Sequence, residues 1–312
     1  MSLSVRELTK SYGDKIVVDH LSFEMEKPGV YALLGTNGAG KTTSIRMILN
    51  LLSKDSGEVL WNGKPLDIST CNVGYLAEER GLYPKYELMD QLIYFAAIRG
   101  VKKDEAKKRI KYWSDKLDLG EYLYPQPIGG RRPKPKKADQ LSKGNQQKVQ
   151  LITALISNPD LIVIDEPFSG LDPVNTDLFK AVIREQIEND KYIIMSSHQM
   201  AAVEEFCTDI TILNKSKTVL QGHLSDIKKS YGRVNLTIKC ESDIMRQIEE
   251  SGARLLTKKE YEYHLKVDGE EQANRLLRKL IDDGVSIVTF DLREPSLHEI
   301  FVEKVGEADE GR

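Results

Sequence analysis

The sequence predicts an α/β fold with a mostly parallel sheet, followed by a small α+β domain. Three observations predict it. Short apolar runs typical of buried strands alternate with amphipathic helix patterns over roughly the first two thirds of the chain. A glycine-rich loop lies between one such run and a helix. After residue 224 the order becomes β-α-β-β-α-β, which is typical of a ferredoxin-like split βαβ module.

The first part of the chain carries both kinds of pattern. Apolar runs predict buried strands at Val30–Leu34, Val73–Leu76, Leu161–Ile164, Tyr192–Met195 and Ile210–Leu213. Amphipathic patterns predict helices at Thr42–Leu52, Leu88–Arg99, Lys103–Leu117, Gly144–Ser157 and Thr176–Asn189. Alternating apolar residues in Leu3–Leu8 and Val17–Phe23 predict an antiparallel edge in addition.

The polar, glycine-containing stretch Asn214–Tyr231 predicts a boundary, so we expect domains at residues 1–224 and 225–312. The expected elements of the second domain are Val234–Lys239, Ser242–Glu250, Arg254–Lys258, Tyr261–Val267, Glu270–Asp282 and Ser286–Leu292. Ser296, with Glu299 three residues later, predicts a capped closing helix through Val305. The acidic tail from Glu307 is expected to fray.

Composition excludes several classes of protein. A net charge of -3, with 30% charged residues, does not indicate a nucleic-acid-binding protein or a global attraction to anionic membranes. The three cysteines, Cys71, Cys207 and Cys240, lack metal-ligand spacing and indicate buried thiols in a reducing cytosol. No apolar run approaches the ~18 residues that span a bilayer, and no signal-peptide pattern is found. We therefore expect a soluble, cytoplasmic chain.

The segment GTNGAGKT, Gly35–Thr42, matches the phosphate-binding pattern G-x-x-x-x-G-K-[ST] between a predicted strand and helix. Its glycines let backbone N–H groups point at phosphate oxygens, and the helix N-terminus favours negative charge. Lys41 would reach the β- and γ-phosphates, Thr42 would ligate Mg²⁺, and Thr43 would contact the α-phosphate. The alternative is a glycine turn before an ordinary helix. The expected ATP-binding residues here are Gly35, Thr36, Asn37, Gly38, Ala39, Gly40, Lys41, Thr42 and Thr43.

The run LIVIDE, Leu161–Glu166, is an apolar strand that ends in two carboxylates. Paired with the phosphate-binding loop, it fits the Walker B element. Asp165 would hold Mg²⁺, and Glu166 would act as the general base toward the attacking water. Without that loop, a strand ending in a solvated acidic turn would explain it equally well.

The segment LSKGNQQKVQL, Leu141–Leu151, begins a predicted helix in which Ser142 can act as the N-cap. A capping serine alone indicates only a helix start. Its position before the acidic strand favours a functional role, because the segment resembles the LSGGQ signature of the ATP-binding cassette (ABC) family. That resemblance covers roughly Ser4–His223. It implies ATP and Mg²⁺ as ligands, and a pair of ATPase domains in which Ser142 and Gly144 contact the partner's ATP.

Three more residues match the family pattern. Asp172 in SGLD resembles the D-loop aspartate, which helps to couple the two sites. His198 in SSHQM resembles the switch histidine, which bonds the γ-phosphate and orients Glu166. Tyr12 in KSYGDK resembles the aromatic residue that stacks on adenine, although an exposed turn tyrosine is the alternative.

The sequence departs from the family pattern at two motifs. The signature has Lys143 and Asn145 where the family has Gly and Gln, but Ser142 and Gly144 remain, so we expect activity to survive. The segment Val73–Pro84 resembles the Q-loop, with Glu78 in place of the usual glutamine. A carboxylate there would add a metal ligand and like-charge repulsion, which would tune the Mg²⁺ dependence and the coupling to a membrane partner.

A third departure is the segment Tyr124–Lys137, YPQPIGGRRPKPKK, which looks like an insertion. Its prolines exclude a helix or a central strand. The segment either contacts a nucleotide, lipid headgroups or a partner protein, or is a mobile solvated loop. Its cations are Arg131, Arg132, Lys134, Lys136 and Lys137.

Two functions compete. The first is the ATPase subunit of a transporter, held at the inner face of the cell membrane by a separate permease, as a homodimer or heterodimer. The second is a soluble ABC ATPase that acts on ribosomes or DNA. Such proteins commonly carry two cassettes or a long coiled coil, whereas this chain has one cassette and no heptad run, which favours transport.

The C-terminal sequence DLREPSLHEIFVEKVG resembles bacterial export-type ATP-binding subunits of the sodium-efflux and drug- or antibiotic-resistance kind. The resemblance implies export of ions, drugs or peptides. For the C-terminal domain it leaves dimer contact, regulation and passive stabilisation open.

Overall fold

The computed structural model describes residues 1–68, 71–79, 81–127 and 134–310. The chain divides into two compact units, Met1–Gln221 and Gly222–Arg312, each with its own hydrophobic core. Arg131 and Arg132 of the basic segment lie outside the described residues.

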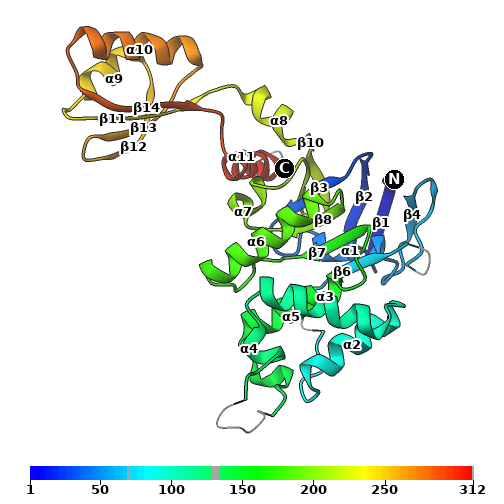
Figure 1. The fold of residues 1–312 in the computed structure, drawn as a ribbon. Helices are drawn as coiled ribbons and strands as arrows, with labels where there is room; N and C mark the ends of the chain where they lie inside the picture. The colour runs from blue at the N-terminus through cyan, green and yellow to red at the C-terminus, as the bar shows by residue number, and fades with distance from the viewer. Residues whose placement is uncertain (69–70, 80, 128–133, 311–312) are drawn as a thin grey trace. The chain divides into compact units, whose positions relative to one another are not determined.

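The first unit is built on a six-stranded sheet with the order β10-β9-β3-β8-β7-β6 (Figure 1). Its strands are β3 (Gly29–Gly35), β6 (Val73–Leu76), β7 (Leu161–Asp165), β8 (Tyr192–Ser197), β9 (Asp209–Asn214) and β10 (Lys217–His223). The strands from β9 to β6 pair in parallel. Every residue of β3, β7 and β8 is buried, which explains their continuous apolar runs. The predicted parallel α/β fold is confirmed.

A second, antiparallel sheet has the order β2-β1-β4-β5. Its strands are β1 (Leu3–Tyr12), β2 (Lys15–Met25), β4 (Ser56–Trp61) and β5 (Lys64–Pro65). The predicted antiparallel strands therefore exist, but they form a sheet of their own. Alternate residues of β1 and β2 point into one core with β3, β7 and β8, because only one face of each strand is buried.

The helices of the first unit divide into two groups. Figure 1 shows α2, α3, α4 and α5 together beyond β6, where α2 packs on α3 and α5. This group is the helical subdomain that the fold prediction expects. The bounds are α1 (Lys41–Ile48), α2 (Leu88–Ile98), α3 (Lys103–Lys116), α4 (Gly120–Leu123), η1 (Ala138–Gln140), α5 (Lys143–Leu155), α6 (Pro173–Glu188) and α7 (Met200–Glu204).

The second unit contains a four-stranded antiparallel sheet with the order β12-β13-β11-β14. This is the order of a split βαβ module, because β13 and β11 each lie between two strands that a helix connects. Its elements are α8 (Leu224–Tyr231), β11 (Asn235–Cys240), α9 (Met245–Ser251), β12 (Arg254–Lys259), β13 (Glu262–Lys266), α10 (Glu270–Asp282), β14 (Ile287–Arg293) and α11 (Leu297–Glu310).

Two details of this region differ from the sequence prediction. The stretch Asn214–Tyr231, for which the sequence predicted only a domain boundary, holds β10 and α8. Leu224 and Ile227 bury one side of α8. The last helix continues beyond Val305, where the sequence predicted its end, to Glu310. Its predicted cap is present: Ser296 N–H donates to Glu299 Oε2 at 2.7 Å, and Glu299 N–H donates to Ser296 Oγ at 3.3 Å. No helix of the described residues is long and apolar enough to cross a membrane.

Candidate functional site

The carboxyl ends of β3, β8 and β7 lie side by side, because β8 is the neighbour of both other strands. In the strand register Ser196 of β8 pairs with Leu33 on one side and with Asp165 on the other. The glycine-rich loop after β3, the acidic pair ending β7 and the SSH segment ending β8 therefore meet at one edge. Open α/β sheets bind their ligands at such an edge.

The loop after β3 has a backbone that requires glycine at two positions. Gly35 has φ 159°, and a Cβ on it would lie 2.5 Å from the carbonyl oxygen of Leu213. Gly40 has φ 106°, and its Cβ would lie 2.5 Å from the carbonyl oxygen of Val17. α1 begins directly afterwards without a side-chain cap, so its first N–H groups are open to an anion. Of the remaining predicted loop residues, Thr36, Asn37 and Gly38 are exposed, Ala39 is buried, and Thr42 and Thr43 are half-buried.

Lys41 lies buried between the loop and the acidic strand. Its Nζ donates hydrogen bonds to the carbonyl oxygens of Gly35 at 2.9 Å and Thr36 at 3.2 Å. The same Nζ lies 3.1 Å from Glu166 Oε1. A positive charge is thus fixed beside the N-terminus of α1, where both would attract the same phosphate.

Glu166 and His198 form the second contact of the site. His198 Nδ1 lies 2.8 Å from Glu166 Oε2, and the His198 backbone N–H donates to the same oxygen at 3.3 Å. Glu166 has φ 51°, a left-handed conformation that is uncommon for a residue other than glycine. Glu166 is almost fully buried, whereas 41% of the His198 side chain is exposed. The imidazole therefore holds one carboxylate oxygen and still faces the outside.

Asp165 is 1% exposed, and burial raises the pKa of its carboxyl group. The hydroxyls of Ser196 and Thr42 lower that pKa in part. Asp165 Oδ2 has no hydrogen bond of normal geometry within the described residues. A buried carboxylate oxygen without a partner, next to a hydroxyl on the phosphate loop, fits a hard divalent cation.

The described residues hold no cluster of three or more histidine, cysteine, aspartate or glutamate side chains that could bind a metal alone. Mg²⁺ commonly takes one or two protein ligands together with phosphate and water oxygens. Thr42 and Asp165 are the pair that the structure brings together for it. Glu78, the third residue suggested by the sequence, is exposed and makes no hydrogen bond or ion pair within the described residues.

Ser196 is a residue that motif reasoning missed. It is fully buried; its hydroxyl donates to Asp165 Oδ1 and accepts the backbone N–H of Glu166 at 3.0 Å. One side chain thus holds the metal-binding candidate and the backbone of the general-base candidate. The only signal in the sequence is a polar residue at the end of an apolar strand, and its meaning depends on β8 lying beside β7.

We expect Ser196→Ala to lower the turnover number for ATP about tenfold and to raise the Mg²⁺ concentration needed for half-maximal activity. Its loss removes one hydrogen bond from buried Asp165 and one from Glu166, each of ordinary strength. Initial rates measured at varied Mg²⁺ check this. Ser197→Ala is the matched control, because the Ser197 hydroxyl accepts from Gln199 N at 2.9 Å and does not touch the acidic pair. Equal kinetics in both variants would refute the role of Ser196.

The signature segment lies outside this cluster. Ser142 caps α5, since its hydroxyl accepts the Asn145 N–H at 3.2 Å. A Cβ on Gly144 would lie 3.0 Å from Asn175 Nδ2, and Asn175 N–H donates at 2.9 Å to Asp172, the N-cap of α6. The Asn175 backbone hydrogen bond is the main cause that lowers the pKa of Asp172. The signature and the predicted D-loop residue are therefore neighbours at the starts of two helices.

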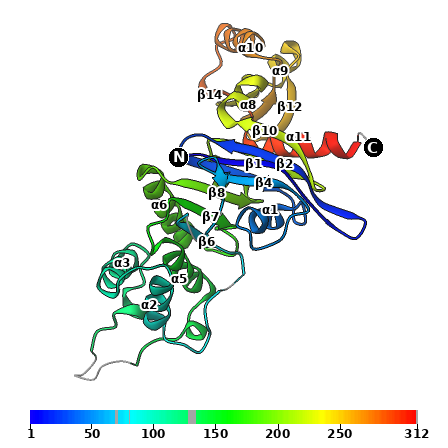
Figure 2. The same cartoon turned by 90° about the vertical axis from the view of Figure 1, so that its right-hand side faces the viewer.

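The separation from the phosphate loop follows from packing. α5 packs mainly on β6, α2 and α3, whereas α1 packs mainly on β1, β2, β3 and β7 (Figures 1 and 2). Ser142 is exposed, and its hydroxyl accepts the hydrogen bond of Asn145 in its own helix. Tyr12, the candidate adenine contact, is 55% exposed at the end of β1, with Lys10 Nζ 5.5 Å from its ring centroid.

Comparison with known proteins points in one direction. Residues 18–169 match the family described as ABC transporter, and residues 222–305 match the C-terminal domain of the ATP-binding protein DrrA1-3-like family. An uncharacterized ABC transporter ATP-binding protein of Bacillus subtilis, YhaQ, is 41% identical over 97% of this chain and 98% of its own length. The linearmycin resistance ATP-binding protein LnrL of Bacillus subtilis is 27% identical over 97% of this chain and 98% of its length. A solved structure titled as the ATP-binding subunit of an ABC transporter has a TM-score of 0.65 and 27% identity, covering 74% of this chain and 93% of its own.

Proposed function

The chain belongs to the family of ATP-binding subunits of ABC transporters, and from this we propose that it binds and hydrolyses ATP to drive a bacterial exporter. The observation that carries the proposal is the cluster at the edge of the parallel sheet. There Lys41, Glu166 and His198 are joined by contacts of 3.1 and 2.8 Å beside a loop shaped for phosphate.

The chemistry divides among the residues of this cluster. The loop from Gly35 to Thr43 and Lys41 would hold the ATP phosphates, with Tyr12 against the adenine. When bound, Mg²⁺ would neutralise phosphate charge, held by Thr42 and Asp165. Glu166 would take the proton from the water that attacks the γ-phosphorus. The bond from the γ-phosphorus to the bridging oxygen would break, which releases ADP and inorganic phosphate. His198 would keep the Glu166 carboxylate in position and reach the γ-phosphate with its exposed side.

A second chain completes the site in this proposal. Ser142 is exposed and Gly144 half-buried at the start of α5, where a serine hydroxyl and helix N–H groups can donate hydrogen bonds to another chain's γ-phosphate. Asn175 lies next to Gly144 and donates a hydrogen bond to Asp172, so Asp172 would respond to the same nucleotide. Two chains related by a two-fold axis, or this chain and a related one, would each supply a phosphate loop and a signature.

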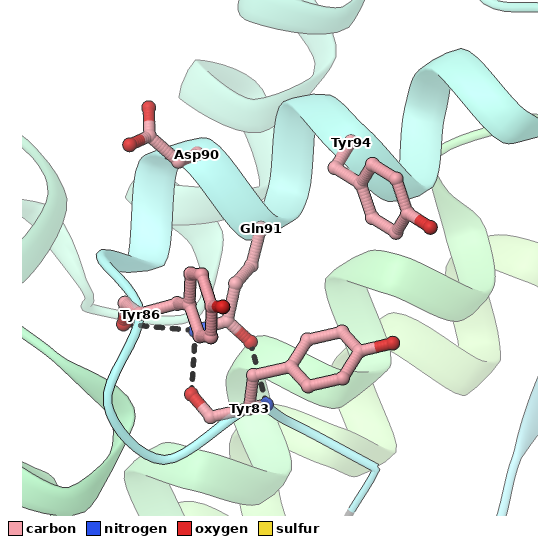
Figure 3. A pocket seen from close by; sticks show the side chains of 5 residues that line it. All are labelled: Tyr83, Tyr86, Asp90, Gln91 and Tyr94. Carbon is pink, nitrogen blue, oxygen red and sulfur yellow. Dashed lines mark hydrogen bonds between the residues drawn. The ribbon is translucent and has the colours of Figure 1, made fainter.

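The membrane partner of the proposal is a separate permease that docks beside the Q-loop segment. A groove there has a volume of about 420 Å³. Figure 3 shows the side chains that line it, Tyr83, Tyr86, Asp90, Gln91 and Tyr94. The residues Tyr83, Tyr86 and Tyr94 are 48%, 64% and 53% exposed, and exposed aromatic residues around a groove are typical of protein contacts. We name this the tyrosine groove.

The tyrosine groove is held by its own hydrogen bonds, and Glu79, which precedes it in the sequence, contacts both nucleotide motifs. Gln91, which is 3% exposed, accepts from Tyr83 N–H at 2.8 Å and donates to the carbonyl oxygens of Tyr83 and Tyr86 at 3.0 Å. A few residues earlier, the Glu79 carbonyl oxygen accepts from Gln150 of the signature helix at 3.2 Å. The Glu79 carboxylate also lies 3.6 Å from Arg46 of α1. Closure of two chains over ATP would therefore move the tyrosine groove with the motifs.

Docking of the permease in the tyrosine groove is tested by two substitutions. We expect Tyr86→Ala and Tyr94→Ala to keep the ATPase rate of the isolated chain but to weaken copurification with the permease about tenfold or more, as loss of an aromatic interface residue does. Tyr261→Ala, at a tyrosine 49% exposed in the second unit, is the control. Unchanged recovery of the permease with both groove variants would exclude docking at this groove.

The export direction, the substrate class and the position of the chain at the inner face of the cell membrane are parts of the proposal. They are supported by the C-terminal match and by the resistance function in the name of one relative. Glu78 is proposed to tune the Mg²⁺ dependence once nucleotide is bound. The ions, drugs or peptides exported would be selected by the permease.

A further inference from the structure

A second groove in the helical group is lined by Met89, Lys107, Lys108, Lys111 and Tyr124, and has a volume of about 660 Å³. We name it the lysine groove. α2 separates the lysine groove from the tyrosine groove, since Met89 lines the lysine groove and the next two residues, Asp90 and Gln91, line the tyrosine groove. The two grooves thus share one helix as a wall.

The lysine groove carries positive charge that is not compensated. Lys107 and Lys108 are exposed, and within the described residues neither has a hydrogen bond or an ion pair to a carboxylate. Lys111 is bonded to Asp115 at 2.5 Å and lies 5.5 Å from the ring centroid of Tyr124. Residues three and four apart share a helix face, so Lys107, Lys108 and Lys111 point to one side of α3.

The basic segment that the family pattern does not explain borders the same groove at both ends. Its first residue, Tyr124, is part of the lining. Near its other end, the carbonyl oxygen of Lys136 accepts a hydrogen bond from Leu88 N–H at 3.0 Å, one residue before Met89. Lys137 pairs with Glu87 in an isolated β-bridge. The backbone of Lys136 and Lys137 is therefore held beside the start of α2, and both residues are exposed.

We propose that the lysine groove binds the phosphate headgroup of an anionic lipid in the cytoplasmic leaflet of the membrane. Ammonium groups without protein partners suit a phosphate, and the methionine, the tyrosine and the lysine stems suit the apolar boundary below it. The inference rests on the proposed function, because a permease docked in the tyrosine groove would hold this helical group against the bilayer. With a net charge of -3 on the whole chain, the attraction is local to this groove.

A lipid fits these observations better than a free phosphate or an acidic peptide. The lining mixes cations with apolar atoms, whereas a site for free phosphate is usually built from buried donors, and these lysines are exposed. An acidic peptide would bind to the same charges. It would, however, show no dependence on a lipid surface, which makes it an outcome that the experiment can separate.

The experiment measures binding of the purified full chain to vesicles of phosphatidylcholine, with and without added phosphatidylglycerol. We expect binding only with phosphatidylglycerol, weakened by salt, and reduced at least about tenfold by the double substitution Lys107→Glu and Lys108→Glu. The control, Lys228→Glu with Lys229→Glu, changes the net charge equally on adjacent lysines of α8 in the second unit. All three chains should retain the same basal ATPase rate, because neither pair belongs to the catalytic cluster.

Three results would overturn the inference. The first is equal binding of the groove variant and the wild-type chain to anionic vesicles. The second is no binding of the wild-type chain to these vesicles. The third is binding of inorganic phosphate by the wild-type chain, without vesicles, as tight as its binding to anionic vesicles. Loss of permease copurification in the groove variant without any vesicle binding would assign the lysines to a protein contact instead. Failure of the transport proposal is recognised separately, as absence of ATP hydrolysis or of any permease in the wild-type preparation.

Discussion

Replacing Glu166 with glutamine is expected to lower the turnover number for ATP about a hundredfold or more and to leave ATP binding intact. The amide has nearly the same shape but cannot accept the proton of the attacking water, and a positioned general base typically contributes factors of this size. His198 can still hold the side chain through a hydrogen bond, so the local structure should persist. Hydrolysis is followed by phosphate release, and binding by a fluorescent ATP analogue.

The control for this prediction is Glu188→Gln, at an exposed position at the end of α6. It removes the same charge far from the acidic pair and should keep the wild-type rate. A Glu166→Gln enzyme with a turnover number within about threefold of the wild type would show that another group takes the proton.

Lys41→Ala and Ser142→Asp are each expected to silence ATP hydrolysis, although the two side chains belong to different clusters. Lys41 is buried beside Glu166, and its loss removes the fixed positive charge on the phosphates. Ser142 touches neither Lys41 nor Glu166 in its own chain. Aspartate is as good an N-cap as serine, so α5 should remain intact while a negative charge faces the partner's γ-phosphate.

The controls keep the helix and change only the charge. Ser142→Thr retains the hydroxyl and the capping ability, so it should keep most of the activity. Circular dichroism should be the same for all the Ser142 variants. Full activity of Ser142→Asp would mean that the signature segment does not meet a phosphate.

The elements predicted best from the sequence are those buried on both faces. β3, β6, β7 and β8 begin and end within about two residues of the predicted strands, because their apolar runs leave no ambiguity of period. α6 starts earlier than predicted, at Pro173, because Asp172 is its N-cap and proline suits the first helical position. The short run that buries Leu224 and Ile227 was too brief to indicate α8.

The sequence predicts the residues of the candidate site that belong to local motifs, but not those that depend on contacts between strands. Motifs name Lys41, Asp165 and His198 because each follows an element with a clear pattern. Ser196 acts through contacts across two strands, and strand order is not encoded in a local pattern. The lysine groove likewise depends on α2, α3 and the more distant residue Tyr124 meeting in space.

The most direct test of the shared nucleotide site is a mixed pair. Lys41→Ala and Ser142→Asp chains carry different affinity tags, and only pairs holding both tags are purified. In a shared site, one of the two sites of each mixed pair has an intact Lys41 and an intact Ser142. The pair should then recover about half of the wild-type hydrolysis, or occlude one ATP when Glu166→Gln is added to both chains. If each signature instead served its own chain's ATP, both sites would be defective, and mixed pairs as inactive as the parents would contradict the shared site.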